Sequence, residues 1–192
     1  MAYNRRAVKP NNLNLIKTNE LIEIWQNHNT SEWQEDVFDE IKEILQDRLG
    51  FIPPLLPEAQ CDQILTVALE KINGGEYSSA QQDCINAIQI YNQSSDAHYF
   101  LGITHEELGN LVEAENNIKK AISLDSNQKD YWKCLKRIES RQRQDFENSL
   151  AKKHLDQAST FILADEDDKA LIECKKAENN YQIKPMLTLC WE

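Results

Sequence analysis

Glycine and proline are scarce in this sequence, with five of each among 192 residues. Both residues interrupt helices, so their scarcity, together with abundant Glu, Gln, Lys, Leu and Ile, predicts an all-α chain that is helical nearly throughout. The sequence also lacks an apolar run of about eighteen residues, and no charged-then-apolar signal segment opens it. These absences predict a soluble, cytoplasmic protein that has no membrane partner.

The sequence also lacks an excess of positive charge, since its net charge is -11. Surfaces that bind phosphates need excess Lys and Arg, so we expect no nucleic-acid partner. The charge is unevenly distributed, because Arg5, Arg6, Lys9 and Lys17 precede the first acidic residue, Glu20. We interpret residues 1–17 as a flexible basic tail. The functional alternative is a basic arm that grips an acidic surface.

Motifs of catalysis are absent too. The sequence has no G-x-S-x-G, no phosphate-binding loop and no H-E-x-x-H, and none of its four histidines has a neighbouring Ser, Cys or carboxylate in a catalytic pattern. His98 and His154 fall at helix-packing positions, where we expect hydrogen-bonded interior imidazoles. The sequence therefore predicts neither an enzyme nor a bound cofactor.

Metal sites are equally poorly supported by the sequence. The five cysteines include no CxxC pair and no His at ligand spacing, so we interpret Cys84 and Cys174 as small core residues. The acidic run 165–168 lacks the alternate spacing, central Gly and distal Glu of a calcium loop. We expect it to form an acidic turn before a helix, and we expect no metal.

What the sequence does contain is a repeated helix-turn-helix pattern. In residues 95–128, Gly102 lies within a first helix, Gly109 makes the turn, and Ala114 and Ala121 lie on a second helix at packing spacing. Shifting the pattern back by 34 residues, onto residues 61–94, places small residues at the same four positions: Ala68, Gly75, Ala80 and Ala87. Small residues let two helix axes approach closely, so the recurrence has a packing reason.

This pattern resembles the tetratricopeptide repeat (TPR) family. The resemblance implies a right-handed superhelix of helical hairpins, in which the first helix of each unit lines a concave face. It also implies a scaffold or adaptor that receives a peptide or helix of another protein. The identity of that protein partner does not follow from the sequence.

A separate helical hairpin is predicted before the repeats, in residues 18–50. Thr18 or Asn19 is expected to cap its first helix, and Ser31 to open a capping box for a second helix that stops at Gly50. Residues 51–60 read as a proline-rich linker with apolar side chains on a surface. We favour this hairpin as a cap on the first repeat, and the alternative is a separate recognition module.

After the second repeat the pattern slips. Residues 129–150 form a degenerate unit, and residues 151–184 a further one in which Ala158, Ala170, Cys174 and Ala177 repeat the spacing. We favour one long helix over residues 129–163, with Trp132 and Leu135 in its core, and the alternative is a break near Gln144. Pro185 is expected to end the last helix, before a tail at residues 185–192. A further interpretation is that the chain is a fragment of a longer protein.

The TPR register also predicts a partner-binding groove. Its members are Leu65, Leu69, Ile72, Tyr99, Ile103, Glu106, Lys133, Arg137 and Arg141. The resemblance further implies a two-carboxylate clamp in chaperone-binding members, but those places hold Leu65, Leu69, Phe100, Asp130 and Cys134, so binding of an acidic C-terminal tail is disfavoured. Two alternatives stay open: a structural or regulatory part of a larger assembly with the groove covered internally, and a homodimer.

Overall fold

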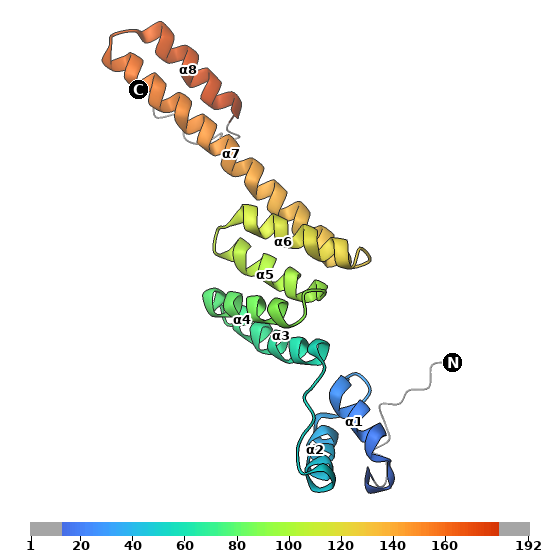
Figure 1. Cartoon of the computed structure of the whole chain (residues 1–192). Helices are drawn as coiled ribbons and strands as arrows, with labels where there is room; N and C mark the ends of the chain where they lie inside the picture. Colours follow the sequence, from blue (N-terminus) through green and yellow to red (C-terminus); the bar gives the residue numbers. More distant parts are fainter. Residues whose placement is uncertain (1–12, 181–192) are drawn as a thin grey trace. The chain divides into compact units, whose positions relative to one another are not determined.

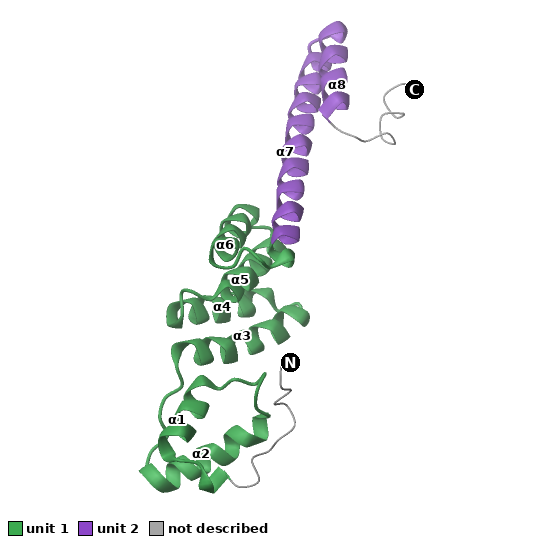
Figure 2. Ribbon diagram, turned by 90° about the vertical axis from the view of Figure 1, so that its right-hand side faces the viewer, with its two compact units in different colours: residues 1–131 green, residues 132–192 purple. Residues whose placement is uncertain are grey.

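A computed structural model describes residues 13–180, which are helical and contain no strand (Figure 1). The all-α expectation is thereby confirmed for this part of the chain. Residues 1–12 of the predicted basic tail, the predicted helix end at Pro185 and the tail at 185–192 lie outside the described residues. The chain divides into two compact units, residues 1–131 and 132–192 (Figure 2). Within the described part, no helix is long and apolar enough to cross a membrane.

The front of the first unit is a small helical hairpin with its own core. The short 3-10 helix η2 (Leu13–Leu15) precedes α1 (Thr18–Asn27) and α2 (Glu35–Leu49). Leu13, Leu21, Ile41 and Leu45 are buried together, at the apolar spacing that each sequence segment shows. Gly50 closes α2 with a φ of 77°, as predicted for a helix-ending glycine.

Both predicted N-terminal caps of this hairpin are wrong. The helix α2 begins at Glu35, after Gln34, and the hydroxyl of Ser31 instead donates a hydrogen bond to Asn29 Oδ1 at 2.6 Å. Asn29 and Ser31 form a local turn, so the serine hydroxyl does not cap α2. The residue that precedes α1 is Lys17, which makes no side-chain cap, so neither Thr18 nor Asn19 has the capping role.

The proline-rich connector is fastened to the end of α1. Trp25 Nε1 donates to the carbonyl of Pro53 at 2.6 Å, and Gln26 Nε2 donates to that of Pro54 at 3.1 Å. The amide of Leu56 in turn donates to the carbonyl of Gln26 at 2.9 Å. The connector is shorter than predicted, because α3 (Pro57–Asn73) begins with Pro57 at a position that prolines favour.

Two consecutive hairpins follow, α3 with α4 (Tyr77–Ile90) and α5 (Ser95–Glu107) with α6 (Leu111–Leu124). Helix α5 packs against both α3 and α4. The small residues of the repeat pattern are fully buried, as the packing argument requires: Ala68, Ala80, Ala87, Ala114 and Ala121 are 0% exposed. These alanines therefore lie where neighbouring helices approach each other most closely.

The second of these hairpins uses a glycine where the first uses an alanine. A Cβ on Gly102 would lie 2.5 Å from Cδ1 of Ile118, so α5 and α6 leave no room for even a methyl group. At the equivalent positions the first hairpin has the buried pair Ala68 and Cys84. A larger side chain on one helix is thus matched by a smaller one on the other.

The last hairpin consists of a long helix and a short one. Helix α7 runs from Lys129 to Leu163 without interruption, as favoured from the sequence, and no break occurs near Gln144. Helix α8 (Asp167–Asn180) follows the acidic turn. Ala158, Ala170 and Ala177 are buried. Trp132 is 51% exposed, so its predicted core position is wrong, whereas Leu135 is buried.

The three hairpins α3–α4, α5–α6 and α7–α8 turn in the same way. At each turn one amide bonds three residues back and the next bonds five residues back: Gly75 to Ile72 and Glu76 to Lys71, Gly109 to Glu106 and Asn110 to His105, Asp165 to Ile162 and Glu166 to Phe161. This is the Schellman pattern of helix ends, and its central residue has a positive φ of 77°, 81° and 60° in turn. The third hairpin therefore repeats the second at a shift of 56 residues, from Gly109 to Asp165.

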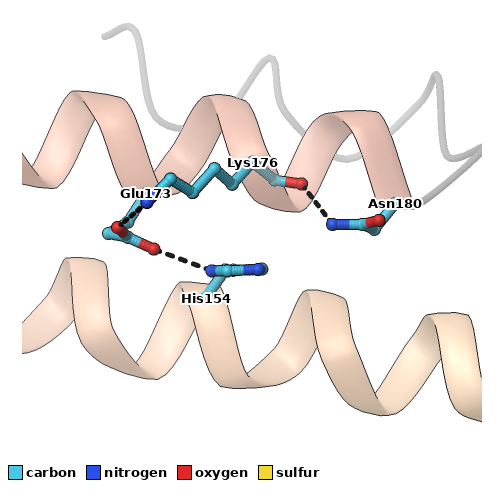
Figure 3. A network of polar contacts seen from close by, with 4 residues as sticks. All are labelled: His154, Glu173, Lys176 and Asn180. Carbon is cyan, nitrogen blue, oxygen red and sulfur yellow. Dashed lines mark hydrogen bonds and ion pairs between the residues drawn. The ribbon is translucent and has the colours of Figure 1, made fainter.

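A polar contact joins the two helices of each of these hairpins. Its residue on the second helix has the same register position each time, whereas Lys71 on the first helix lies seven residues beyond the position that His98 and His154 share. Lys71 contacts Asp83 at 2.5 Å in the first, and His98 Nδ1 lies 3.4 Å from Asn117 Oδ1 in the second. In the third, His154 Nδ1 lies 2.7 Å from Glu173 Oε2 (Figure 3). Both histidines are hydrogen-bonded, as expected from the sequence, but they are half-buried and not interior residues.

Candidate functional site

The predicted groove residues of the first unit differ widely in exposure. Leu65 and Glu106 are 5% and 1% exposed, so their side chains offer little surface to a partner. Leu69 is 40% exposed, and Ile72 and Ile103 are half-buried. These three apolar side chains come from α3 and α5, which pack against each other. They form the accessible part of the predicted face, which we call the α3–α5 face.

Tyr99 belongs to the predicted groove but is engaged within the protein. Its ring lies 4.7 Å from that of Tyr131 and 5.6 Å from that of Phe100. The phenol of Tyr131 donates a hydrogen bond to Asp96 and lies 3.2 Å from Ser95 Oγ, and burial together with the Asp96 bond raises the pKa of the phenol. Tyr99 therefore holds the start of α7 in place, and a partner would meet only the part of its ring that remains exposed.

The three basic members of the predicted groove, Lys133, Arg137 and Arg141, lie on α7 in the second unit. All three are exposed. Arg137 Nη2 lies 3.5 Å from Cys134 Sγ. Their residue types suit an acidic partner segment, as the sequence predicts.

A second surface was not foreseen from the sequence: an acidic cleft in the first unit. Its volume is about 1080 Å³, and its walls are α1, the loop that leads to α2, and the first turns of α3. Six carboxylates line it, Glu20, Glu23, Glu32, Glu35, Glu58 and Asp62, and no Lys or Arg does. On α3 the lining ends at Thr66, before Leu69, so the acidic cleft is separate from the α3–α5 face.

Like charges in the acidic cleft affect one another. Burial raises the pKa of Asp62, and the negative charges of Asp96 and Glu58 raise it further. The phenol of Tyr91 has a raised pKa because it is hydrogen-bonded to Glu58. The shifts indicate a negative potential along this side of α3 that no cation among the lining residues offsets.

One lining residue of the acidic cleft is incompletely paired. The side chain of His28 is 7% exposed, stacks on Phe38 with ring centroids 3.9 Å apart, and places Nε2 at 3.2 Å from Glu35 Oε1. Its Nδ1 is buried and has no hydrogen-bond partner. A buried polar atom without a partner is uncommon in folded proteins, because the lost hydrogen bond costs about 1–3 kcal/mol.

The sequence did carry a partial signal for the acidic cleft. Glu20 and Glu23 are three residues apart, and Glu58 and Asp62 are four apart, so each pair occupies one face of its helix. Nothing in the sequence showed that the two faces meet. That depends on the bonds between the connector and α1.

Within residues 13–180, no group of three or more His, Cys, Asp or Glu side chains is placed to hold a metal ion. In comparisons with known proteins, no family model matches this chain and no curated protein matches it.

Proposed function

We propose that this chain is a protein-interaction module of the TPR type, which binds a peptide or helix of a partner protein on its α3–α5 face. The observation that carries the proposal is the repetition of one hairpin design. The same Schellman turn and buried small residues at the same positions recur in the three hairpins that follow the front one. A hairpin that repeats in this way cannot bury its apolar face alone and stacks on its neighbours.

The α3–α5 face supports the binding role. Its first helices lie next to each other, and between them they leave Leu69, Ile72 and Ile103 partly accessible. Adjacent apolar side chains on a helical surface suit an amphipathic segment, whose own apolar residues recur every three or four positions. Partly exposed Leu and Ile are also the residues that a partner would remove from water with most gain.

The test combines a double aspartate variant, a single aspartate control and partner capture. Leu69→Asp with Ile103→Asp places charge on the α3–α5 face without touching the Tyr99–Tyr131 contact. The matched control is Val112→Asp, since Val112 is 62% exposed on α6 and lies outside the face. Tagged protein is used to capture partners from an extract of its source cells, and the bound protein is quantified against the bait.

The proposal expects a stoichiometric partner that is retained by Val112→Asp and lost with the double variant. A partner that is retained equally by all three proteins contradicts binding at this face. Circular dichroism melting of each variant ensures that the comparison is made between folded proteins. Light scattering on the purified protein tests the homodimer alternative, because an apolar face used for self-association gives twice the monomer mass.

A further inference from the structure

One side of the α7–α8 hairpin is less buried than the corresponding side of the first hairpin. The second hairpin repeats the first at a shift of 34 residues and the third repeats the second at a shift of 56, so the third corresponds to the first at a shift of 90. Leu65 of α3 is 5% exposed and Cys84 of α4 is 0% exposed. Their counterparts are Leu155 of α7, which is 44% exposed, and Cys174 of α8, which is half-buried. We call the side that carries Leu155 and Cys174 the open side.

In the first hairpin this side is covered by the start of the next helix, α5. Ala97 and Leu101, the third and seventh residues of α5, are buried in one core with Leu65 and Cys84, and Phe100, the sixth, packs against that core. The third, sixth and seventh residues of α7 are buried as well: Tyr131, Cys134 and Leu135. A helix that follows a completed hairpin therefore buries these three positions in its first two turns.

The sequence after α8 repeats this pattern. Helix α8 has 14 residues, as α4 and α6 have, and four residues separate each of those two helices from the next one. The same spacing after Asn180 leads to Pro185, and proline is favoured at the first position of a helix. Counted from Pro185, the third, sixth and seventh residues are all apolar: Leu187, Cys190 and Trp191. Residues 185–192 lie outside the described part of the chain, and the match is one of sequence.

We propose that residues 185–192 dock on the open side of the α7–α8 hairpin, in the way that the start of α5 covers the α3–α4 hairpin. Leu187, Cys190 and Trp191 then face the open side, and the exposed part of Leu155 is removed from water. Because residues 181–184 join this segment directly to α8, its concentration at the open side exceeds that of a separate protein molecule. The open side is thereby closed to a partner, and the inference does not depend on binding at the α3–α5 face.

The correspondence with the first hairpin has one exception. Glu178 of α8 is exposed and has the position that the half-buried Ile88 has in α4. Covering a carboxylate that has no partner is costly, so the segment should leave Glu178 in water. We therefore expect its contacts to concentrate on Leu155 and Cys174, and the experiments use these two residues as reporters.

The direct test is NMR spectroscopy of the full chain with ¹³C-labelled leucine and isoleucine methyl groups. We expect nuclear Overhauser contacts from the indole ring of Trp191 to the methyl groups of Leu155, and none to those of Ile162. Ile162 is 58% exposed on α7, seven residues or about 10 Å further along the helix. The variant Trp191→Phe assigns the indole signals.

A mixed sample identifies the molecule that supplies the segment. Labelled protein is combined with an equal amount of deuterated, unlabelled protein. A contact within one molecule keeps its strength per labelled molecule, whereas a contact between two copies falls by half.

Two neighbouring substitutions test the register. Leu187→Asp places a carboxylate at a position that is buried in both α5 and α7. The matched control is Met186→Asp, at a position where α5 and α7 themselves have an exposed aspartate. We expect Leu187→Asp to raise the rate at which iodoacetamide labels Cys174 by about threefold or more and to speed hydrogen exchange in α8, and Met186→Asp to change the labelling rate by less than about 1.5-fold.

Each of three results would overturn the proposal. Absence of the contact between Trp191 and Leu155 in the unmodified protein would show that the segment lies elsewhere. A contact that falls by half in the mixed sample would assign the open side to a second copy. Equal labelling of Cys174 in the two aspartate variants would show that the register does not determine the contact.

Discussion

At the residue scale, Gly102 shows how little space separates two helices of one hairpin. Its hydrogen atoms face Cδ1 and Cγ1 of Ile118, which an added Cβ would approach to 2.5 and 2.8 Å. Both residues are fully buried on helices joined by a short turn, so the contact cannot relax by moving a surface side chain. This contact therefore limits how closely α5 and α6 can approach each other.

We predict that Gly102→Ala lowers the free energy of unfolding by about 1–3 kcal/mol, because overpacking outweighs the gain in helix propensity. Ile118→Cys alone should also be destabilising, through the cavity it leaves. The double variant recreates the Ala68 and Cys84 pair and should be more stable than the sum of the single effects by about 1 kcal/mol or more. Urea denaturation measures all three, and strictly additive effects would contradict the volume argument.

Asp165 occupies the turn position that glycine has in the other two hairpins. Its φ of 60° lies in the left-handed region, where an L side chain is strained and Gly is not. Asp165→Gly should therefore raise the free energy of unfolding of the α7–α8 hairpin by about 0.5–1 kcal/mol.

A matched control for this prediction is Asp167→Gly. Asp167 is in the first turn of α8, where a carboxylate is favourable and a glycine weakens the helix, so the same change should cost about 1 kcal/mol. Thermal melts followed by ellipticity distinguish the two positions. Destabilisation by Asp165→Gly would show that the aspartate side chain contributes more than its backbone strain costs.

At the scale of elements, α7 and α8 are joined by a contact between a histidine and a carboxylate, where the second hairpin has one between a histidine and an amide. Glu173 contacts Lys176 Nζ at 2.6 Å on its own helix and His154 Nδ1 at 2.7 Å on α7, as Figure 3 shows. The hydrogen bond from Lys176, followed by that from His154, lowers the pKa of Glu173 below its ordinary value near 4.5. Asn117, which takes this place in α6, has no charge to titrate.

This arrangement predicts that the stability of the α7–α8 hairpin falls in acid. A carboxyl whose pKa falls on folding stabilises the folded state fully above its ordinary value of 4.5, and that stabilisation is lost as pH falls through the lowered pKa. Glu173→Gln should reduce stability at about pH 6 and flatten its decline below about pH 4.5. Hydrogen exchange of residues 151–180 at several pH values measures the stability of this hairpin.

Glu178→Gln is the control, because Glu178 is exposed on the same helix and no contact to α7 involves it among the interactions of the described residues. It should leave the pH dependence unchanged. If both variants flatten the decline equally, the dependence comes from the overall charge of α8.

The elements themselves could largely be predicted, and for identifiable reasons. The alanine spacing located α4, α5 and α6, and the absence of a stop signal between Asn110 and Lys184 favoured the unbroken α7. The helix starts were harder, since Ser31 satisfies Asn29 in a turn that no capping rule anticipates. Trp132 shows the remaining limit: register alone placed it in the core, and the structure exposes it.

At the scale of the whole molecule, the cores of the first unit enclose thiols that solvent does not reach. Cys61 and Cys84 are 0% exposed in the cluster between α3, α4 and α5. Burial raises the pKa of the Cys84 thiol to about 12, and that of Cys61 is raised for the same reason. At pH 8 a thiol of this kind is almost entirely protonated and does not react with alkylating reagents.

We predict that iodoacetamide at about pH 8 leaves Cys84 and Cys61 unmodified in the folded protein, and that Cys174, which is half-buried, is the first of the four cysteines within residues 13–180 to react. Mass spectrometry after a short pulse assigns each site. Increasing urea should expose Cys61 and Cys84 together, because they share one core. Rapid labelling of Cys84 without denaturant would show that this core opens far more readily than its burial indicates.

The candidate surfaces were predictable only in part. The register identified Leu69, Ile72 and Ile103 as members of the α3–α5 face, but it could not show that Leu65 and Glu106 become buried in packing. The acidic cleft was not predicted, because hydrogen bonds to the main-chain carbonyls of Pro53, Pro54 and Gln26 bring its walls together. A pattern of side chains in the sequence does not specify main-chain hydrogen bonds of this kind. Side-chain periodicity indicates the buried face of a single helix and does not show which helices lie next to each other.

The second hairpin pairs the small Gly102 with the large Ile118, whereas the first pairs Ala68 with Cys84. This difference in side-chain volume limits which helices of the chain can be exchanged. A chimera that joined a first helix of the α3 kind to a second helix of the α6 kind would set an alanine methyl against an isoleucine, and the reverse graft would leave a hole between glycine and cysteine. The two helices of each hairpin are thus a matched couple, and exchanging one of them alone should destabilise the hairpin.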